Sequence, residues 1–133
     1  GIRSTAFDMA VVGQMLLNQG GYGDLRFFSE ETYEALLPVD LENYFPNIKD
    51  RKWGIGITPM NRYLKDEGSG EKRNILSDHV IGHGSATSSI LNVDLENKIV
   101  ICQSRLDKGR QYHEYLNRAY LLIEKYHDAA PGH

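Results

Sequence analysis

The sequence predicts an α+β fold in which antiparallel strands pack against helices. Apolar residues recur at helical spacing near both ends of the chain, over residues 5–17 and 111–127. The middle of the chain instead holds short apolar runs bounded by turn residues. Two of these runs, 88–94 and 98–104, are joined by a short polar turn and predict an antiparallel hairpin. Helices, then antiparallel strands, then a helix form the pattern of an α+β domain.

The first helix is predicted to begin after Thr5. Thr5 with Asp8 three residues later resembles a capping box, with aspartate in the place of glutamate. The apolar side chains that follow at helical spacing are Met9, Val12 and Leu16. Residues 18–21 (NQGG) end this helix, and a turn and a short extended segment at 25–28 follow.

A second helix is predicted to begin at residues 29–32, where two glutamates in the first turn suit the helix dipole. Its inward side chains are Tyr33, Leu36 and Leu37. It is expected to end at Pro38, because the residue before a proline disfavours helix. The sequence predicts an irregular loop over residues 39–52.

The remaining elements are strands and one long helix. Residues 53–57 (WGIGI) predict a strand whose glycines indicate a close backbone approach or a bulge. Residues 66–71 form a polar turn, and residues 73–81 lead into the next strand. The helix over 111–127 is expected to carry one apolar face. The residues of that face are Tyr112, Leu116, Ala119, Ile123 and Tyr126.

Length and composition are those of a globular domain. The 133 residues suffice for one domain with a real core. The formal net charge of −3, with scattered lysines and arginines, gives no electrostatic footprint for nucleic acid. No apolar run approaches the roughly 18 residues of a membrane span. Cys102 is the single cysteine, which excludes an internal disulfide, and its apolar surroundings predict a buried, inert thiol.

A segment of small residues between two strand-like runs carries the clearest chemical signal. It comprises His83, Gly84, Ser85, Ala86 and Thr87. Small side chains at the edge of a hairpin let a substrate lie against backbone N–H groups, which can stabilise an oxyanion. Such a site needs a nucleophile opposite it, and none is evident among these residues.

Three other patterns favour structural roles. Residues 69–72 spell S-x-x-K, but the serine lies between two glycines in a polar turn, which is poor helix material. Residues 115–117 spell Y-x-N inside the predicted terminal helix. His79 and His83 stand four residues apart, but the glycines around His83 disfavour a helix and no third ligand is evident. We expect neither a metal site nor a cofactor.

Three segments, in order along the chain, carry a family resemblance. Residues 1–10 read GIRSTAFDMA, similar to the segment G-[LI]-x-S-T-A-x-D-[ML]-A. Residues 53–56 read WGIG and resemble a W-G-[LI]-G strand. Residues 82–87 read GHGSAT, followed by Val93-Asp94, and resemble G-H-G-G-A-T…V-D-P-E. Together they resemble the C-terminal part of the serine β-lactamase-related family, which includes class C β-lactamases, D-Ala-D-Ala carboxypeptidases and related esterases.

The resemblance implies roles for the central segment. His83 falls where the family has the lysine or histidine of its third motif, which helps to bind the substrate carboxylate and supports proton transfer. Imidazole changes charge near neutral pH, unlike a lysine. The Ala86 N–H falls at the second donor of the oxyanion hole. The substrate-binding positions are Gly84, Ser85 and Thr87.

The chain departs from the family pattern at three positions. Ser85 replaces the usual glycine and adds a side chain where substrate passes close to the strand. Ser88 also stands where glycine is common, and Leu95 replaces the proline of the V-D-P-E turn. These changes bear on which substrate is bound.

The family's S-x-x-K helix and its Y-x-N or S-x-N loop lie upstream of the segment that residues 1–10 resemble. The resemblance therefore implies the C-terminal portion of a β-lactamase/transpeptidase-like fold. Residues 1–52 would end the helical subdomain, and residues 53–133 would supply later sheet strands and the C-terminal helix. The incomplete sheet would expose an apolar edge and face, so we expect self-association. The parent protein would be bacterial and periplasmic, extracellular or membrane-anchored.

Two main functions remain open. The parent is expected to be a serine hydrolase acting on a β-lactam, a D-alanyl peptide or an ester, with the serine in the missing N-terminal part. The chain alone would then be inactive. The alternative is a non-catalytic binding or regulatory module on the same scaffold, and a third, weaker alternative is a purely structural domain.

Overall fold

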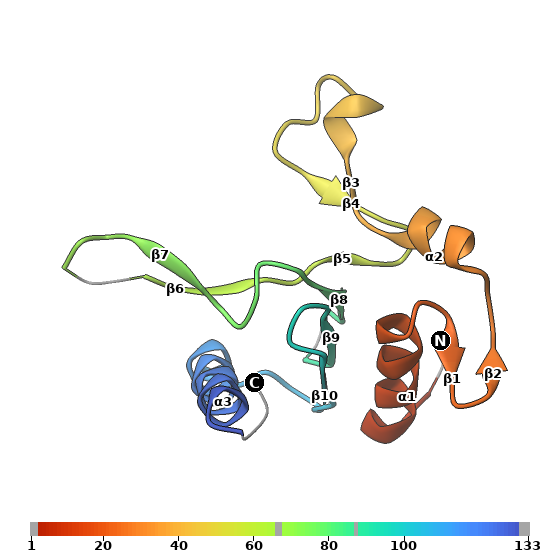
Figure 1. Cartoon of the computed structure of the whole chain (residues 1–133). Helices are drawn as coiled ribbons and strands as arrows, with labels where there is room; N and C mark the ends of the chain where they lie inside the picture. Colours follow the sequence, from red (N-terminus) through yellow and green to blue (C-terminus); the bar gives the residue numbers. More distant parts are fainter. Residues whose placement is uncertain (1–2, 66–67, 87, 131–133) are drawn as a thin grey trace.

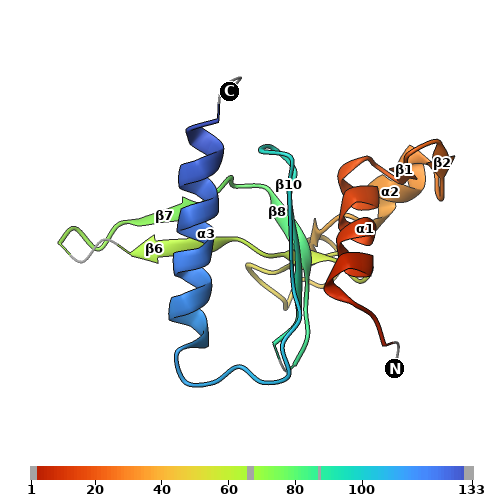
Figure 2. The same cartoon turned by 90° about the horizontal axis from the view of Figure 1, so that it is seen from below.

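A four-stranded antiparallel sheet forms the centre of the structure, with one helix on each face (Figure 1). The computed structural model describes residues 3–65, 68–86 and 88–130. The strand order is β10-β9-β8-β5, with β5 at Thr58–Pro59, β8 at Val80–Gly84, β9 at Ile90–Asp94 and β10 at Ile99–Gln103. Figure 2 shows α1 (Ala6–Leu17) on one side of the sheet and α3 (Tyr112–Asp128) on the other. The predicted α+β class and the predicted hairpin, now β9–β10, are confirmed.

The alternation of side chains along the central strands separates two cores. Successive residues of a strand point to opposite faces of the sheet. On one face, Leu91 and Val93 of β9 pack with Val100 of β10 beside α1. On the other face, Ile90 and Ile101 pack against α3. Each helix therefore has its own buried contact with the sheet.

The helix α1 begins as predicted. The Asp8 N–H donates to Thr5 Oγ1 at 3.1 Å, and the Thr5 N–H donates to Asp8 Oδ2 at 3.4 Å, which completes the capping box. Gly13 lies directly on the sheet, because a Cβ built there would stand 2.4 Å from Val100 Cγ1 and 2.8 Å from Leu91 Cδ1. The missing side chain lets the helix approach β9 and β10 closely.

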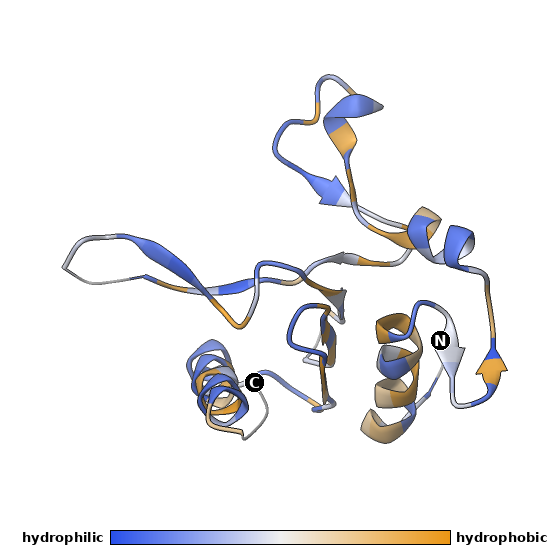
Figure 3. Cartoon of the chain, viewed as in Figure 1, coloured by the Kyte–Doolittle hydropathy of each residue, from blue (hydrophilic) through white to orange (hydrophobic). Residues whose placement is uncertain are grey.

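The other side of α1 is apolar but uncovered. Of the three apolar side chains at helical spacing, Leu16 is buried, whereas Met9 and Val12 are 37% and 38% exposed. Figure 3 shows that apolar residues surround most of α1, while the β6–β7 hairpin is largely polar. Helices with apolar residues on most sides are usually buried. Among the described residues, no helix has the length and apolar character needed to cross a membrane.

The helix α3 packs through a face that differs from the predicted one. Tyr112 and Leu116 are buried as expected, and Tyr120 completes the packed stripe. Ala119 and Tyr126, predicted for that face, are exposed. They belong to a second, exposed stripe made of Tyr115, Ala119, Leu122 and Tyr126. The prediction was wrong because α3 carries apolar side chains on two faces, and spacing alone does not decide which face meets the sheet.

Shorter elements surround the sheet. They are β1 (Gly21–Tyr22), β2 (Leu25–Arg26), α2 (Glu30–Leu36), β3 (Val39–Asp40), η1 (Leu41–Asn43), β4 (Lys52–Trp53), β6 (Arg62–Lys65) and β7 (Lys72–Ile75). The helix α2 ends before Pro38 as predicted, and its Tyr33 is buried. The predicted loop over 39–52 is not wholly irregular, because β3 pairs with β4 at its two ends.

Of the predicted strand over residues 53–57, only Trp53 lies in a strand, β4, and residues 54–57 form a bend between β4 and β5. The Gly54 N–H donates to Ile57 O at 2.8 Å, and Gly56 has a φ of +71°, which turns the chain. A Cβ on Gly54 would stand 2.2 Å from Leu36 O, so the expected close backbone approach occurs there. The two glycines therefore direct the chain around α2 and back into β5.

Candidate functional site

The outer edge of β8 is only partly covered. β5 pairs with β8 at Ile81 and Gly82, and no other strand of the described residues lies on that edge. On its inner edge, β8 pairs with β9 along its whole length, with His83 opposite Leu91. The backbone at His83 and Gly84 is therefore held on one side and open on the other.

The two glycines beside His83 meet different surroundings. Gly82 has a φ of +154°, and a Cβ there would stand 1.9 Å from Leu91 O. Only glycine fits at that position. A Cβ on Gly84 would find its nearest atom, Met60 Cε, at 3.7 Å, which is ordinary contact. The fold thus requires Gly82 but leaves room at Gly84.

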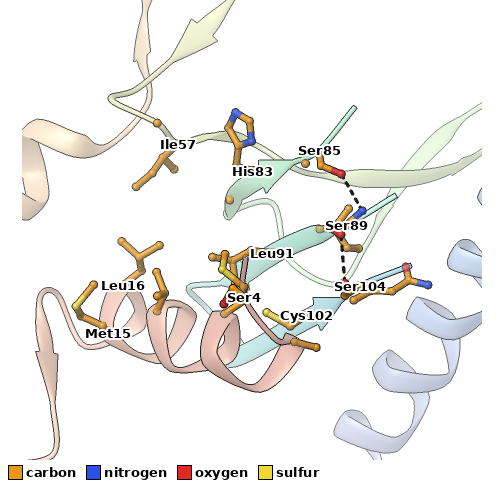
Figure 4. Close-up of a pocket in the computed structure, with 18 of the residues that line it drawn as sticks. Ser4, Met15, Leu16, Ile57, His83, Ser85, Ser89, Leu91, Cys102 and Ser104 are labelled. Carbon is orange, nitrogen blue, oxygen red and sulfur yellow. Dashed lines mark hydrogen bonds between the residues drawn. The ribbon is translucent and has the colours of Figure 1, made fainter. Parts of the chain in front are cut away.

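A groove of about 1050 Å³ runs between α1, β8 and the bend over residues 55–57 (Figure 4). Its apolar wall includes Met9, Val12, Met15, Leu16, Ile55 and Ile57. Its polar lining includes Arg3, Ser4, His83, Ser85, Ser89 and Ser104. The volume lies at the upper end of the roughly 300–1000 Å³ typical of small-molecule sites. The structure therefore brings His83, Gly84, Ser85 and Ala86 together at one groove.

His83 is exposed on the groove side of β8, where Figure 4 shows its ring standing out from the strand. Within the described part of the chain, its side chain makes no hydrogen bond or ion pair with another residue. Because the ring is exposed, water can satisfy its nitrogens, and the fold does not need them bonded. The uncommitted ring is therefore available to a ligand.

Ser85 holds the turn that follows β8. The Ser85 N–H donates to Ser89 O at 2.8 Å. The Ser85 Oγ accepts hydrogen bonds from the N–H groups of Ser88 at 3.2 Å and Ser89 at 2.9 Å. The Ala86 N–H bonds to no other residue that the structure describes, and Ala86 lines the groove. Thr87, predicted to bind substrate, lies outside the described residues.

Ser88 anchors the same turn to the α3 side of the molecule. Its Oγ donates to Arg105 O at 2.6 Å, and the Tyr112 Oη donates to Ser88 O at 3.2 Å. Ser88 is buried, and Ser89 Oγ lies 3.4 Å from Ser104 Oγ at the polar end of the groove. The serines at 85 and 88, which depart from the family pattern, thus fasten the turn at the site.

Asp94 fixes the strand ends behind the site. Its buried carboxylate accepts hydrogen bonds from Ser77 N and Oγ, Glu96 N, and Asn97 N and Nδ2. Burial raises the pKa of Asp94, but the hydrogen bonds from Ser77 and Asn97 outweigh it and hold the pKa below its usual value. The Leu95 N–H donates to His79 O at 3.1 Å, a bond that a proline lacks the hydrogen to make.

Sequence reasoning missed some residues that line the groove. Arg3, Ser89 and Ser104 all contribute to it, and only Arg3 lies within a segment that carried a family signal. Cys102 also lines the groove and is half-buried. The prediction of a buried thiol therefore holds only in part, and burial raises the pKa of this thiol, which disfavours the thiolate form.

The weaker sequence patterns have structural roles. The S-x-x-K of residues 69–72 lies in the β6–β7 hairpin and not on a helix. On α3, Asn117 Oδ1 accepts a hydrogen bond from Arg62 Nε at 3.0 Å. The His79 ring is paired with the Glu96 carboxylate. The described ranges contain no group of three side chains arranged to hold a metal ion.

Comparisons with family models, curated proteins and solved structures gave no match for this chain. The functional interpretation therefore rests on the open edge of β8, the groove beside it and the three ordered segments of the sequence.

Proposed function

We propose that this chain forms one wall of the active site of a serine hydrolase that acts on a β-lactam, a D-alanyl peptide or an ester. One observation carries the proposal. His83 and Ala86 line the same groove at the open end of β8, and neither the His83 ring nor the Ala86 N–H bonds to another described residue. Acyl transfer needs a free N–H donor and a group that handles protons beside the reacting carbonyl. The segments that resemble the serine β-lactamase-related family support the same reaction.

In the proposed reaction, a serine hydroxyl from outside these residues attacks the substrate carbonyl carbon, and its proton passes to a lysine or tyrosine base. The carbonyl oxygen becomes an oxyanion, to which the Ala86 N–H donates a hydrogen bond. Cleavage of the bond to the leaving group transfers the proton to that group and leaves an acyl-serine. Water then attacks the acyl-serine, which releases the acid and returns a proton to the serine. His83 would bind the substrate carboxylate and support the proton transfers.

The nucleophile would enter on a segment that packs against the uncovered side of α1. Met9 and Val12 are partly exposed and form part of the groove wall. A helix with only two polar side chains, Asp8 and Gln14, favours cover over much of its surface. We therefore place the serine-bearing segment on this wall, with its hydroxyl directed toward Ala86.

The same resemblance supports the C-terminal portion of a β-lactamase/transpeptidase-like fold. Residues 1–52 would end the helical subdomain, and residues 53–133 would supply the later strands and the last helix. In the described part of the chain, β10 has a strand on one edge only, and the second stripe of α3 is uncovered. Further strands and a helix would join there in the parent, and a second copy would join there in the isolated chain. The resemblance favours a bacterial periplasmic, extracellular or membrane-anchored parent.

A binding module is the second candidate. Ser85 is the serine next in sequence to Ala86, the proposed oxyanion donor. Its Oγ accepts hydrogen bonds from two backbone N–H groups, which hold the turn. Among the described residues that line the groove, no hydrogen bond connects a nucleophilic side chain to a basic one. If the rest of the protein supplies no serine, the same groove would bind a carboxylate ligand without turnover.

The test uses the full protein that the gene encodes, beside the 133 residues alone. A fluorescent penicillin or a fluorophosphonate should label the full protein and leave the short chain unlabelled. The His83→Ala variant should lose about 10²- to 10⁴-fold in turnover, with an unchanged unfolding midpoint because the ring has no partner to lose. His113→Ala, on an exposed α3 position outside the groove, is the control. Labelling of the short chain, or full turnover in His83→Ala, would contradict the proposal, and saturable binding without labelling would favour the module.

A further inference from the structure

Arg3 brings a cationic side chain to the groove, beside the imidazole of His83. It precedes α1 and lines the same groove as His83, which comes from β8. The guanidinium makes no hydrogen bond or ion pair with any other residue that the structure describes. The nearest acid in sequence, Asp8, is already bonded to the Thr5 N–H and hydroxyl within the capping box. Arg3 therefore remains available to a ligand.

The rest of the groove does not compensate this charge. None of the described residues that line it is an aspartate or a glutamate. Most of the wall is apolar, and apolar walls strengthen the field of a charge inside a cleft by excluding water. An unpaired guanidinium in an apolar groove without an acid favours an anionic group on the ligand, in addition to the group that His83 would bind.

We infer that the groove takes an acyl substrate with a second anionic group, and that Arg3 is the residue that binds it. This inference rests on the proposed function, which assigns the first carboxylate to His83 and the carbonyl oxygen to Ala86. A guanidinium presents paired N–H donors that match a carboxylate, so Arg3 selects a planar anion by geometry as well as by charge. Monoanionic or neutral analogues would leave Arg3 without a partner.

The test compares ligands that differ only in the second charge. The probes are α,ω-dicarboxylates of four to six carbons and the monoamide of each, because the amide keeps the shape and removes one charge. They are titrated into the full protein and followed by NMR at the Ala86 amide, which reports binding in this groove. The best dicarboxylate should bind about tenfold more tightly than its monoamide, and added salt should reduce the difference.

Two variants test the assignment to Arg3. Arg3→Gln should abolish the preference for the dicarboxylate, and Arg3→Lys should keep part of it because the charge remains. Arg110→Gln, in the loop before α3 and outside the groove, should keep all of it. Arg3 is exposed and bonded to no described residue, so its replacement leaves folding intact, which circular dichroism verifies.

The outcomes separate this inference from the proposed function. Equal affinity for the dicarboxylate and the monoamide, or a preference that survives Arg3→Gln, overturns the role of Arg3. If the protein is still labelled by a fluorophosphonate in that case, the hydrolase proposal stands. If Arg3 confers the preference in a protein that no acylating probe labels, the anion site stands and the hydrolase proposal falls.

Discussion

Replacing Asp94 with asparagine should destabilise the fold behind the proposed site. Asp94 is 1% exposed, and its two oxygens accept bonds from the backbone and side chains of Ser77 and Asn97 and from Glu96 N. These bonds join the segment before β8 to the turn between β9 and β10. The Asp94→Asn change keeps the size of the side chain but turns one acceptor oxygen into a donor NH₂ group.

The expected cost follows from the bonds that the amide breaks. An amide at position 94 must direct its NH₂ either at the Ser77 N–H and Asn97 Nδ2 or at the N–H groups of Glu96 and Asn97. Two buried or part-buried donors then lose their acceptor, at about 1–3 kcal/mol each, partly offset by rotation of the Ser77 hydroxyl. We expect the free energy of unfolding to fall by about 3 kcal/mol at pH 7.

The cost should depend on pH with a definite sign. The pKa of Asp94 is lowered in the folded protein, so its ionisation adds stability that is fully present above its ordinary value of 3.8. That stability is lost as the pH falls from about 3.8 through the lowered folded value. Hydrogen bonding from Arg73 also lowers the pKa of Glu124, so the wild type alone does not isolate Asp94. The difference between the wild type and Asp94→Asn does isolate it, and this difference should shrink below about pH 4.

The assay is urea unfolding followed by circular dichroism at several pH values between about 3 and 7. Asp107→Asn, in an exposed loop, is the control and should change stability by less than about 0.5 kcal/mol. A loss below about 1 kcal/mol for Asp94→Asn at pH 7, or a difference that grows as the pH falls, would refute the role of the carboxylate.

Three further changes test the packing. Gly13→Ala should cost about 1–3 kcal/mol in urea unfolding, because its Cβ would stand 2.4 Å from Val100 Cγ1, while Gly21→Ala, whose nearest atom is at 3.6 Å, should be nearly neutral. Tyr120→Phe removes the hydroxyl that accepts a bond from the buried Asn92 Nδ2 and should cost about 1–3 kcal/mol, whereas Tyr126→Phe, at a residue 72% exposed, should cost nothing measurable. In sedimentation velocity, the isolated chain should associate as its concentration rises. Leu122→Lys on the uncovered α3 stripe should weaken this association. A chain that stays monomeric at every concentration would contradict the expectation.

Local signals in the sequence predicted elements that depend on neighbouring residues. The pairing of Thr5 with Asp8, the proline after α2 and the polar turn at residues 95–98 each act within a few positions, and the structure has all three features where they were expected. Features set by distant contacts were not accessible. The bend at Gly54 arises because the chain passes close to Leu36 O. The sequence of residues 53–57 does not predict that contact.

The candidate site shows the same division. His83 and Ala86 lie on one groove because both belong to a single strand and the turn that follows it. Arg3 joins them only because α1 docks on β9 and β10 through Gly13, a contact about 80 residues away in sequence. Ser88 likewise fastens the turn through hydrogen bonds with Arg105 and Tyr112. The spacing of residues in the sequence does not predict these contacts.

Because Gly82 and Gly84 differ in their surroundings, a library of variants at both positions contains its own control for loss of folding. At position 82, every replacement meets Leu91 O at 1.9 Å, so loss of function there accompanies loss of soluble protein. At position 84, a methyl group finds 3.7 Å to Met60 Cε, so an alanine variant should express normally. Depletion of Gly84 variants under selection for activity, at normal abundance, would therefore report on substrate passage along the strand. Two positions two residues apart would in this way separate selection for folding from selection for chemistry.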